Sequence, residues 1–280
     1  MEYFLKQGYK TDKIMIKALT YICFVLLLIP AGLSAQDSIR YVEEMPFQRG
    51  ESGKYRIYYD SWITSGISAG VGLISIKDEV RVFNGRPTFH LEVIGKSVGF
   101  FSWFFKVDDR FESFVDEETI TPYHFIRRTK EGSYTYEDDV DFDQVNHIAR
   151  SRRAEKPVPP DVKDIVSAFY YMRTIDFSDA EAGDEFRLDF YLDDSAYVSK
   201  IVFEGREVVE TSLGKFRCLK FKPMVAQGEI FQEPYPMTLW VTDDRNKAPV
   251  LGKSAVIVGS VKIELVKIKG LKYPMEAKLD

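Results

Sequence analysis

The sequence predicts a mainly β fold: a large antiparallel curved sheet or half-barrel of roughly a dozen strands, with one packed α-helix at about residues 162–174. Phe and Tyr are abundant, at 21 and 16 of 280 residues, and such side chains suit a half-buried pleated surface. From Gly53 onward apolar and polar residues alternate with period two, and glycines fall between the alternating segments. One segment breaks this period, and it predicts the helix.

The N-terminus has the layout of a secretory signal peptide. Four lysines precede an apolar run at residues 18–35, which ends in small residues. The unbroken apolar part is too short for a transmembrane anchor, and Cys23 lies inside it rather than where a lipid-modified cysteine would stand. We therefore expect residues 1–35 to be cleaved, which leaves an N-terminal extension at 36–52 and a single β-rich domain at 53–280.

Cleavage would also set the charge and the redox chemistry of the mature chain. Cys218 would be its only cysteine, so no intramolecular disulfide could form, and the apolar neighbours of Cys218 predict a buried thiol. The segment carries four Lys, Glu2 and Asp12, so its removal takes the net charge from −5 to −7. An acidic chain argues against nucleic acid as a partner, because phosphate backbones favour a basic face.

The expected strands follow the alternation in chain order. Strands at 54–63 and 71–79 are followed by Asn84-Gly85, a type I′ turn signal, and then by a strand at 87–96. Further strands are expected at 106–115, 123–129, 134–142, 145–152, 186–192, 197–204, 207–212, 215–225, 237–242, 250–258 and 261–268.

The helix is predicted from its start signals and its apolar spacing. Prolines precede Asp161, which is a favourable N-cap, and Asp164 stands three residues later, where the acid of a capping box belongs. Val162, Ile165 and Phe169 then recur at helical spacing, so the helix should pack one apolar stripe on the sheet.

Residues 66–70 read GISAG, a literal match to the G-x-S-x-G nucleophile elbow of hydrolases. That motif requires a helix directly after its serine, whereas Ser68 is followed by another alternating segment. The catalytic histidine would also come late in the chain, but the last of the three histidines is His147. We therefore expect Ser68 to lie in a β-strand, with Gly66 and Gly70 at a bend or a close approach.

The acidic run at residues 137–143 contains D-x-D-x-D, the beginning of a calcium loop. The sixth and twelfth positions of an EF-hand would need Gly and Glu, and they hold Gln144 and Arg150. We interpret the run as an acidic, solvent-facing strand face. No zinc spacing and no phosphate-binding loop are present, so neither a metal nor a cofactor is predicted, while paired carboxylates for glycoside chemistry stay open.

The segment GFFSWFF at residues 99–105 is too dense in aromatics for clean alternation. As a short helical turn it would bury one side and offer the other. It is either a hydrophobic plug that closes one end of a barrel, or an aromatic wall or lip for an apolar ligand or a membrane surface.

Several segments in a fixed order resemble one exported bacterial family. They are YYDSWITSGISAGVG, DDRFESFVDEETITPYHF, DIVSAFYYMR, LGKFRCLKFKP, LWVTDDRNKAPV and GSVKIEL, and they cover most of the chain from Gly53 to Leu265. The family is the domain of unknown function 3108. The resemblance implies a mostly antiparallel β fold in the periplasm, and it brings no catalytic residues, so none are assigned.

These observations favour a non-enzymatic envelope protein, periplasmic or associated with the outer envelope and soluble after cleavage, which binds an apolar or amphipathic, lipid-like ligand and contacts membranes peripherally. One alternative is a carboxylate-dependent hydrolase of envelope glycan or lipid. Another is a structural or interaction module of an envelope assembly. The residues expected to line the ligand site are Trp62, Phe100, Phe101, Trp103, Phe104, Phe105, Tyr170 and Trp240.

Overall fold

The computed structural model describes residues 41–60, 66–224, 235–255 and 259–279. Its strands are β1 (Ser52–Asp60), β2 (Ile67–Ile76), β3 (Arg81–Phe83), β4 (Arg86–Ser97), β5 (Asp108–Asp116), β6 (Pro122–Glu131), β7 (Tyr134–Asp143), β8 (Ile148–Arg150), β9 (Glu155–Pro157), β10 (Lys163–Asp164), β11 (Glu185–Arg187), β12 (Phe190–Leu192), β13 (Ser195–Tyr197), β14 (Lys200–Thr211), β15 (Gly214–Pro223), β16 (Met237–Thr242), β17 (Pro249–Ala255), β18 (Ser260–Lys269) and β19 (Lys278–Leu279). The helices are α2 (Phe101–Phe104) and α3 (Ile165–Met172).

Sixteen of these strands form one sheet, which confirms the predicted mainly β, antiparallel fold. Its hydrogen-bonded path runs β11-β14-β15-β16-β17-β18-β1-β2-β4-β5-β6-β7-β8-β9, with β3 beside β4 and β19 beside β15. In the described part of the chain β9 and β11 are the two ends of this path. A separate small sheet, β10-β12-β13, contains a parallel pair between β10 and β12.

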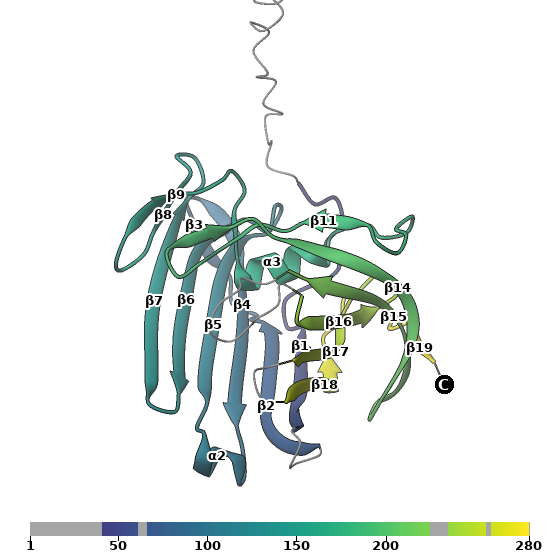
Figure 1. Ribbon diagram of the computed structural model, residues 1–280. Helices are drawn as coiled ribbons and strands as arrows, with labels where there is room; N and C mark the ends of the chain where they lie inside the picture. Colours follow the sequence, from purple (N-terminus) through teal and green to yellow (C-terminus); the bar gives the residue numbers. More distant parts are fainter. Residues whose placement is uncertain (1–40, 61–65, 225–234, 256–258, 280) are drawn as a thin grey trace, which may run out of the picture. The chain divides into compact units, whose positions relative to one another are not determined.

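Helix α3 connects the two principal apolar clusters of the core. Its residues Val166 and Tyr170 pack in a cluster with side chains from β4 to β7, whereas Met172 joins a second cluster with Phe203 of β14 and Phe221 of β15. Figure 1 accordingly shows α3 between these two groups of strands. The predicted helix is present and packs on the sheet, but it is shorter than expected.

The predicted N-cap of this helix was wrong by three residues. Asp164 is the N-cap: its carboxylate accepts the N–H groups of Val166 and Ser167 at 2.8 and 2.9 Å, and the Ser167 hydroxyl accepts the Asp164 N–H. Asp161 instead lies in a left-handed turn at φ 56°. The hydroxyl of Ser113 donates to the buried Asp164 carboxylate at 2.5 Å, so the cap also fixes the helix to β5.

Three of the expected strands are joined or divided differently in the structure. Most of the expected strands at 197–204 and 207–212 lies in one strand, β14 (Lys200–Thr211), because Gly205 at φ 117° makes a bulge where the register with β15 shifts, rather than a turn. The expected strand at 186–192 is divided between β11 in the large sheet and β12 in the small sheet.

Part of the predicted N-terminal extension belongs to the core. Phe47 is buried between the rings of Phe89 and Tyr170, at centroid distances of 5.6 and 5.1 Å. Glu51, also buried, forms a bidentate pair with the guanidinium of Arg173, which directly follows α3. This segment therefore ties the start of the sheet to the helix.

The GISAG segment forms the start of β2, as predicted. Ser68 lies in the strand opposite Tyr58 and not at a strand-to-helix turn, so the hydrolase elbow is absent. Gly70 lies at a close approach: a Cβ there would stand 2.6 Å from the carbonyl oxygen of Lys96. Gly66 adopts φ 62°, in the left-handed region that favours glycine.

Candidate functional site

The aromatic segment at residues 100–105 forms an exposed turn between β4 and β5, which we call the aromatic tip. Trp103 is 86% exposed, Phe104 74%, Phe100 68% and Phe105 45%. Figure 1 shows α2 beyond the ends of β4 and β5. The interpretation as a hydrophobic plug was therefore wrong, because these rings point to solvent. The alternative, an aromatic lip, agrees with this placement.

The local sequence explains why the segment turns here. Gly99 at φ 57° ends the extended backbone of β4, and its carbonyl accepts the hydroxyl of Ser102 at 2.7 Å. Phe101 is the anchor of the turn, since its ring packs against Tyr59 of β1 at 5.8 Å. At Phe105 the backbone returns to an extended conformation, which ends the helical turn after four residues.

The surroundings of the tip hold charges of both signs. Lys96 pairs with Asp108 at 3.1 Å across the bases of the two strands, and Lys106 is exposed. Glu131 lies beside Asp109, and burial together with the charge of Asp109 raises the pKa of Glu131. Burial likewise raises the pKa of Asp109. The tip is thus an apolar surface on a base without a strong excess of one charge.

The other residues of the predicted lining lie elsewhere. Tyr170 is fully buried in the cluster of β4 to β7, and its hydroxyl has no hydrogen-bond partner within the described residues. Trp240 is buried in a third cluster with Phe216, where its indole donates to Glu207. Neither shares a surface with the tip. Trp62 lies outside the described residues.

A group of acids on β4, on β5 and in the connection from β2 to β3 is relevant to the hydrolase alternative. His90 is buried between Glu79 and Glu112, with 2.7 Å from each ring nitrogen to a carboxylate oxygen. Glu92 and Glu112 both contact the same nitrogen of Arg110 at 3.0 Å. Each carboxylate is therefore compensated by a basic group. The His90 ring is almost completely buried, so its two hydrogen bonds connect Glu79 to Glu112 of β5 across β4.

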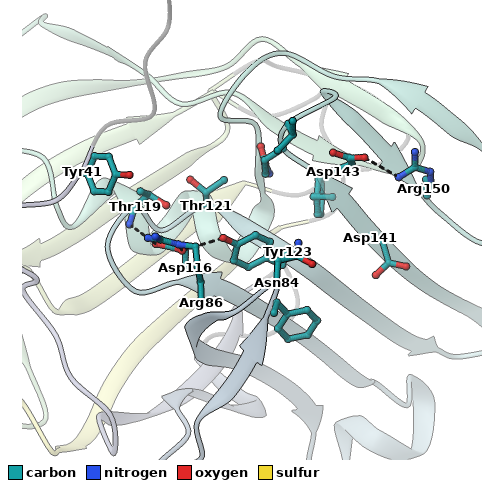
Figure 2. A pocket seen from close by; sticks show the side chains of 14 residues that line it. Tyr41, Asn84, Arg86, Asp116, Thr119, Thr121, Tyr123, Asp141, Asp143 and Arg150 are labelled. Carbon is teal, nitrogen blue, oxygen red and sulfur yellow. Dashed lines mark hydrogen bonds and ion pairs between the residues drawn. The ribbon is translucent and has the colours of Figure 1, made fainter.

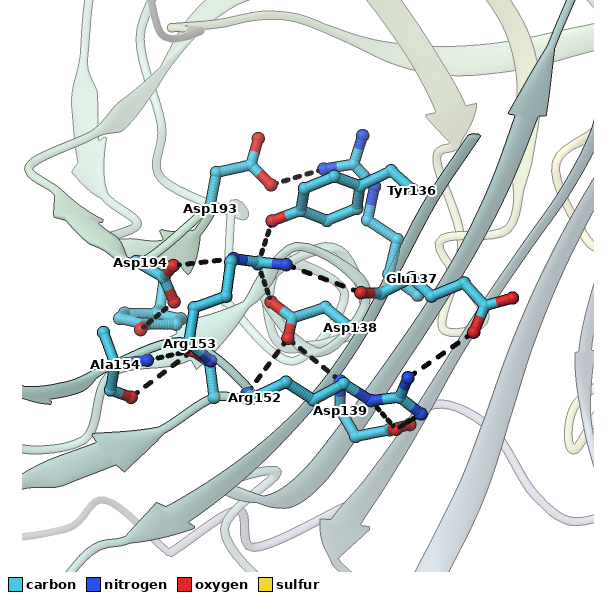
Figure 3. Close-up of polar contacts among 12 residues, drawn as sticks. Tyr136, Glu137, Asp138, Asp139, Arg152, Arg153, Ala154, Asp193 and Asp194 are labelled. Atoms are coloured by element: carbon cyan, nitrogen blue, oxygen red, sulfur yellow. Dashed lines mark hydrogen bonds and ion pairs between the residues drawn. The ribbon is translucent and has the colours of Figure 1, made fainter. Parts of the chain in front are cut away.

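The acidic run on β7 is only partly the solvent-facing surface that we predicted. Glu137 and Asp141 are exposed, but Asp138 is buried on the opposite face. It pairs there with Arg153 at 2.7 Å, in the polar cluster of Figure 3. Tyr136, from the same face of the strand, stacks under the Arg153 guanidinium at 4.5 Å. The period of the strand explains the error, since Asp138 shares the parity of the inward-facing residues.

Two further observations concern the described residues only. Within those ranges no group of three or more His, Cys, Asp or Glu side chains is arranged to hold a metal ion. In the same part of the chain no helix is long and apolar enough to span a bilayer.

The fold defines the class of protein as one built on a large, β-barrel-like antiparallel sheet. A solved structure described as a β-barrel-like protein of domain of unknown function DUF1849 from Brucella abortus is similar to this chain, with a TM-score of 0.51 and 12% identity. The match covers 80% of this chain and 98% of that one. This likeness concerns the fold alone.

The chain belongs to the family described as "Protein of unknown function (DUF3108)", whose model matches residues 54–266. A more distant match is a candidate exported protein with a YmcC-like fold from Bacteroides fragilis, with a TM-score of 0.32, 12% identity, and coverage of 80% of this chain and 98% of that one. Another is a candidate lipoprotein from Parabacteroides distasonis, with a TM-score of 0.36, 13% identity, and coverage of 80% and 97%. No curated protein matches the chain.

Proposed function

We propose that this protein is an exported, non-enzymatic component of the cell envelope that binds amphipathic lipid, and that the aromatic tip is the part that enters the lipid surface. The observation that carries the proposal is the exposure of Phe100, Trp103, Phe104 and Phe105 together on one turn. Isolated exposed apolar residues are ordinary in soluble proteins, whereas a cluster of large ones typically belongs to a contact surface.

The composition of the tip fits the interface of a bilayer. Indole and phenyl rings bury apolar surface among acyl chains, and the indole N–H of Trp103 can keep a hydrogen bond at headgroup level. Phe100 and Phe104 contact each other edge to face at 4.6 Å, so the rings form one surface. Two rings would therefore enter together, and each is worth about 1.5–3 kcal/mol when fully buried.

The charges at the base of the tip indicate how the binding is driven. Lys96 is neutralised by Asp108, and the pair of Asp109 and Glu131 lies on the next strands. Electrostatic attraction to anionic lipid should thus be weak. Binding should depend on ring insertion, and it should vary little with salt.

The sequence supports export. A basic stretch, an apolar core and small residues at 1–35 have the order of a cleaved secretory signal, and a mature chain limited to Cys218 needs no disulfide. These features would place the tip in the compartment where it meets membranes or lipid aggregates.

The test is co-sedimentation of the mature chain with phosphatidylcholine vesicles, with and without phosphatidylglycerol. Trp103→Ser/Phe104→Ser should reduce binding at least about tenfold, because two inserted rings are lost. A matched control, Val198→Ser/Val208→Ser, removes two other exposed apolar side chains and should bind like the wild type. Equal binding of the tip variant and the wild type, or no binding of the wild type to either vesicle, would refute the proposal.

A further inference from the structure

A pocket of about 670 Å³ lies at the other end of β4 and β5 from the aromatic tip. Figure 2 shows its walls, which come from the turns that join β3 to β4, β5 to β6 and β7 to β8. Arg86 begins β4 and Asp116 ends β5, and both line the pocket. Because β4 has 12 residues, the pocket stands about 40 Å from the tip along the strand.

The charged groups on the first side of the pocket are paired with one another. Arg86 forms a bidentate pair with Asp116, and it also donates to Glu118 at 2.8 Å. Burial alone would raise the pKa of Asp116, but the hydrogen bonds from Arg86, the Glu118 amide and Tyr123 outweigh it and hold this pKa below its usual range. Asp116 is therefore ionised at neutral pH, and both of its carboxylate oxygens accept hydrogen bonds from these groups.

The charged groups on the second side of the pocket are also paired with one another. Arg150 pairs with Asp143 at 3.4 Å and with Glu155 at 2.8 Å. Asp141 accepts a hydrogen bond from His124 at 2.6 Å. Three carboxylates and two guanidiniums line the pocket, so a negatively charged ligand would meet an unfavourable field.

Aromatic rings supply the apolar part of the wall. Phe83 and Tyr123 are parallel, with an interplanar angle of 5° and a centroid distance of 6.1 Å. Phe83 in turn rests on Phe114 at 5.5 Å. Both pocket rings are only half-buried, so they offer apolar surface among polar groups.

One polar atom in the wall is left without a partner. The amide nitrogen of Gln144 donates to the carbonyl of Pro122 at 3.0 Å, which fixes the side chain. Its oxygen Oε1 is buried and has no hydrogen-bond partner in the described part of the chain. A buried acceptor of this kind is normally satisfied, by water or by a ligand group. The exposed amide of Asn84 adds donors at the entrance.

We propose that this pocket binds a neutral sugar ring of an envelope glycan. A sugar ring presents one C–H face, which matches the patch of Phe83 and Tyr123, and a perimeter of hydroxyls, which can donate to Gln144 and accept from Asn84. A wall whose arginines are already paired and whose carboxylates outnumber them favours an uncharged ligand with many hydroxyls over an anion or an acyl chain. This inference does not depend on the aromatic tip.

The test is isothermal titration calorimetry of the full mature chain with three neutral oligosaccharides: maltotriose, cellotriose and triacetylchitotriose. At least one should bind with a dissociation constant of about 1 mM or lower, and Phe83→Leu should weaken it at least about tenfold, because leucine keeps the packing on Phe114 but removes the flat face. Gln144→Met, which keeps the side-chain shape without the amide, should also weaken it.

Two controls separate this site from the tip and from other ligand classes. Trp103→Ser/Phe104→Ser should bind the sugar like the wild type, whereas Phe83→Leu should still bind vesicles. Absence of heat with all three sugars at about 10 mM would overturn the proposal. Tighter binding of inorganic phosphate than of any of the sugars would do the same, as would an unchanged affinity in Phe83→Leu.

Discussion

The buried pair of Arg173 and Glu51 should be the most sensitive polar contact in the core. The guanidinium donates to both carboxylate oxygens at 2.6 and 3.0 Å and twice to the carbonyl of Asn246, at 2.9 and 3.1 Å. Its planar face also lies over the rings of Phe47 and Tyr170. The substitution Arg173→Met would remove all of these contacts while keeping most of the side-chain volume.

The expected loss of unfolding free energy follows from the Glu51 carboxylate that remains in the core. Glu51 would stay buried without a compensating charge, and breaking such a pair from one side typically costs about 3–5 kcal/mol. For a domain of this size each kcal/mol lowers Tm by about 2–4 °C, so the melting temperature should fall by about 6–20 °C. The double variant Arg173→Met/Glu51→Leu should recover most of this loss, because no charge is then left in the core.

Urea unfolding followed by circular dichroism measures these free energies. The surface pair of Lys200 and Glu185 provides the matched control, and Lys200→Met should cost less than about 1 kcal/mol. A loss below about 1 kcal/mol in Arg173→Met, equal to that of the surface control, would refute the reasoning, since it would mean that Glu51 is not desolvated in the folded chain.

Three further predictions concern other parts of the molecule. Burial raises the pKa of the Cys218 thiol to about 12, so in the native state the thiol should resist a reagent such as Ellman's reagent, whereas in urea it should react fully. Rapid labelling of Cys218 in the native state would contradict this. Burial and repulsion from Asp109 raise the pKa of Glu131, so protonated Glu131 favours folding at low pH, and this contribution to stability is lost as the pH rises through the folded-state pKa. Glu131→Gln should therefore raise the urea midpoint near about pH 7.5, with little gain near about pH 3.5. An equal gain at both pH values would refute the coupling. Gly70→Val should destabilise the chain by at least about 1 kcal/mol in the same assay, because its Cβ would meet the Lys96 carbonyl oxygen at 2.6 Å; a neutral effect would show that the strands can separate.

The strands could be predicted because their signal is local. Alternation predicted β2, and the turn residues predicted the Asn84-Gly85 turn, in which Asn84 and Gly85 both have positive φ angles. The N-cap of α3 could not be chosen from sequence alone, since Asp161 and Asp164 both follow the prolines. In the structure Asp164 caps the helix and also accepts the hydroxyl of Ser113, from a strand about fifty residues away in the chain, a contact that the sequence does not show.

The exposed aromatic turn could be predicted to a similar extent. Crowded aromatics indicated a turn with one side exposed, and the structure places Phe100 to Phe105 in this way. The sequence could not show that Tyr170 and Trp240 belong to separate core clusters, because composition carries no distances. For the same reason the pocket could not be predicted from the sequence, because its walls come from three turns that only the strand register brings together. The alternation of β7 was the one signal that could have placed Asp138 inside.

The most direct test of lipid insertion is depth-dependent quenching of Trp103. In a Trp62→Phe background the remaining tryptophans are Trp103 and the buried Trp240, and the variant Trp62→Phe/Trp103→Phe gives the signal of Trp240 alone. With vesicles of phosphatidylcholine brominated at different acyl positions, Trp103 emission should shift to the blue and be quenched most by bromines near the headgroups, at the depth where interfacial aromatics lie. Emission that neither shifts nor is quenched by any of these lipids would contradict the account.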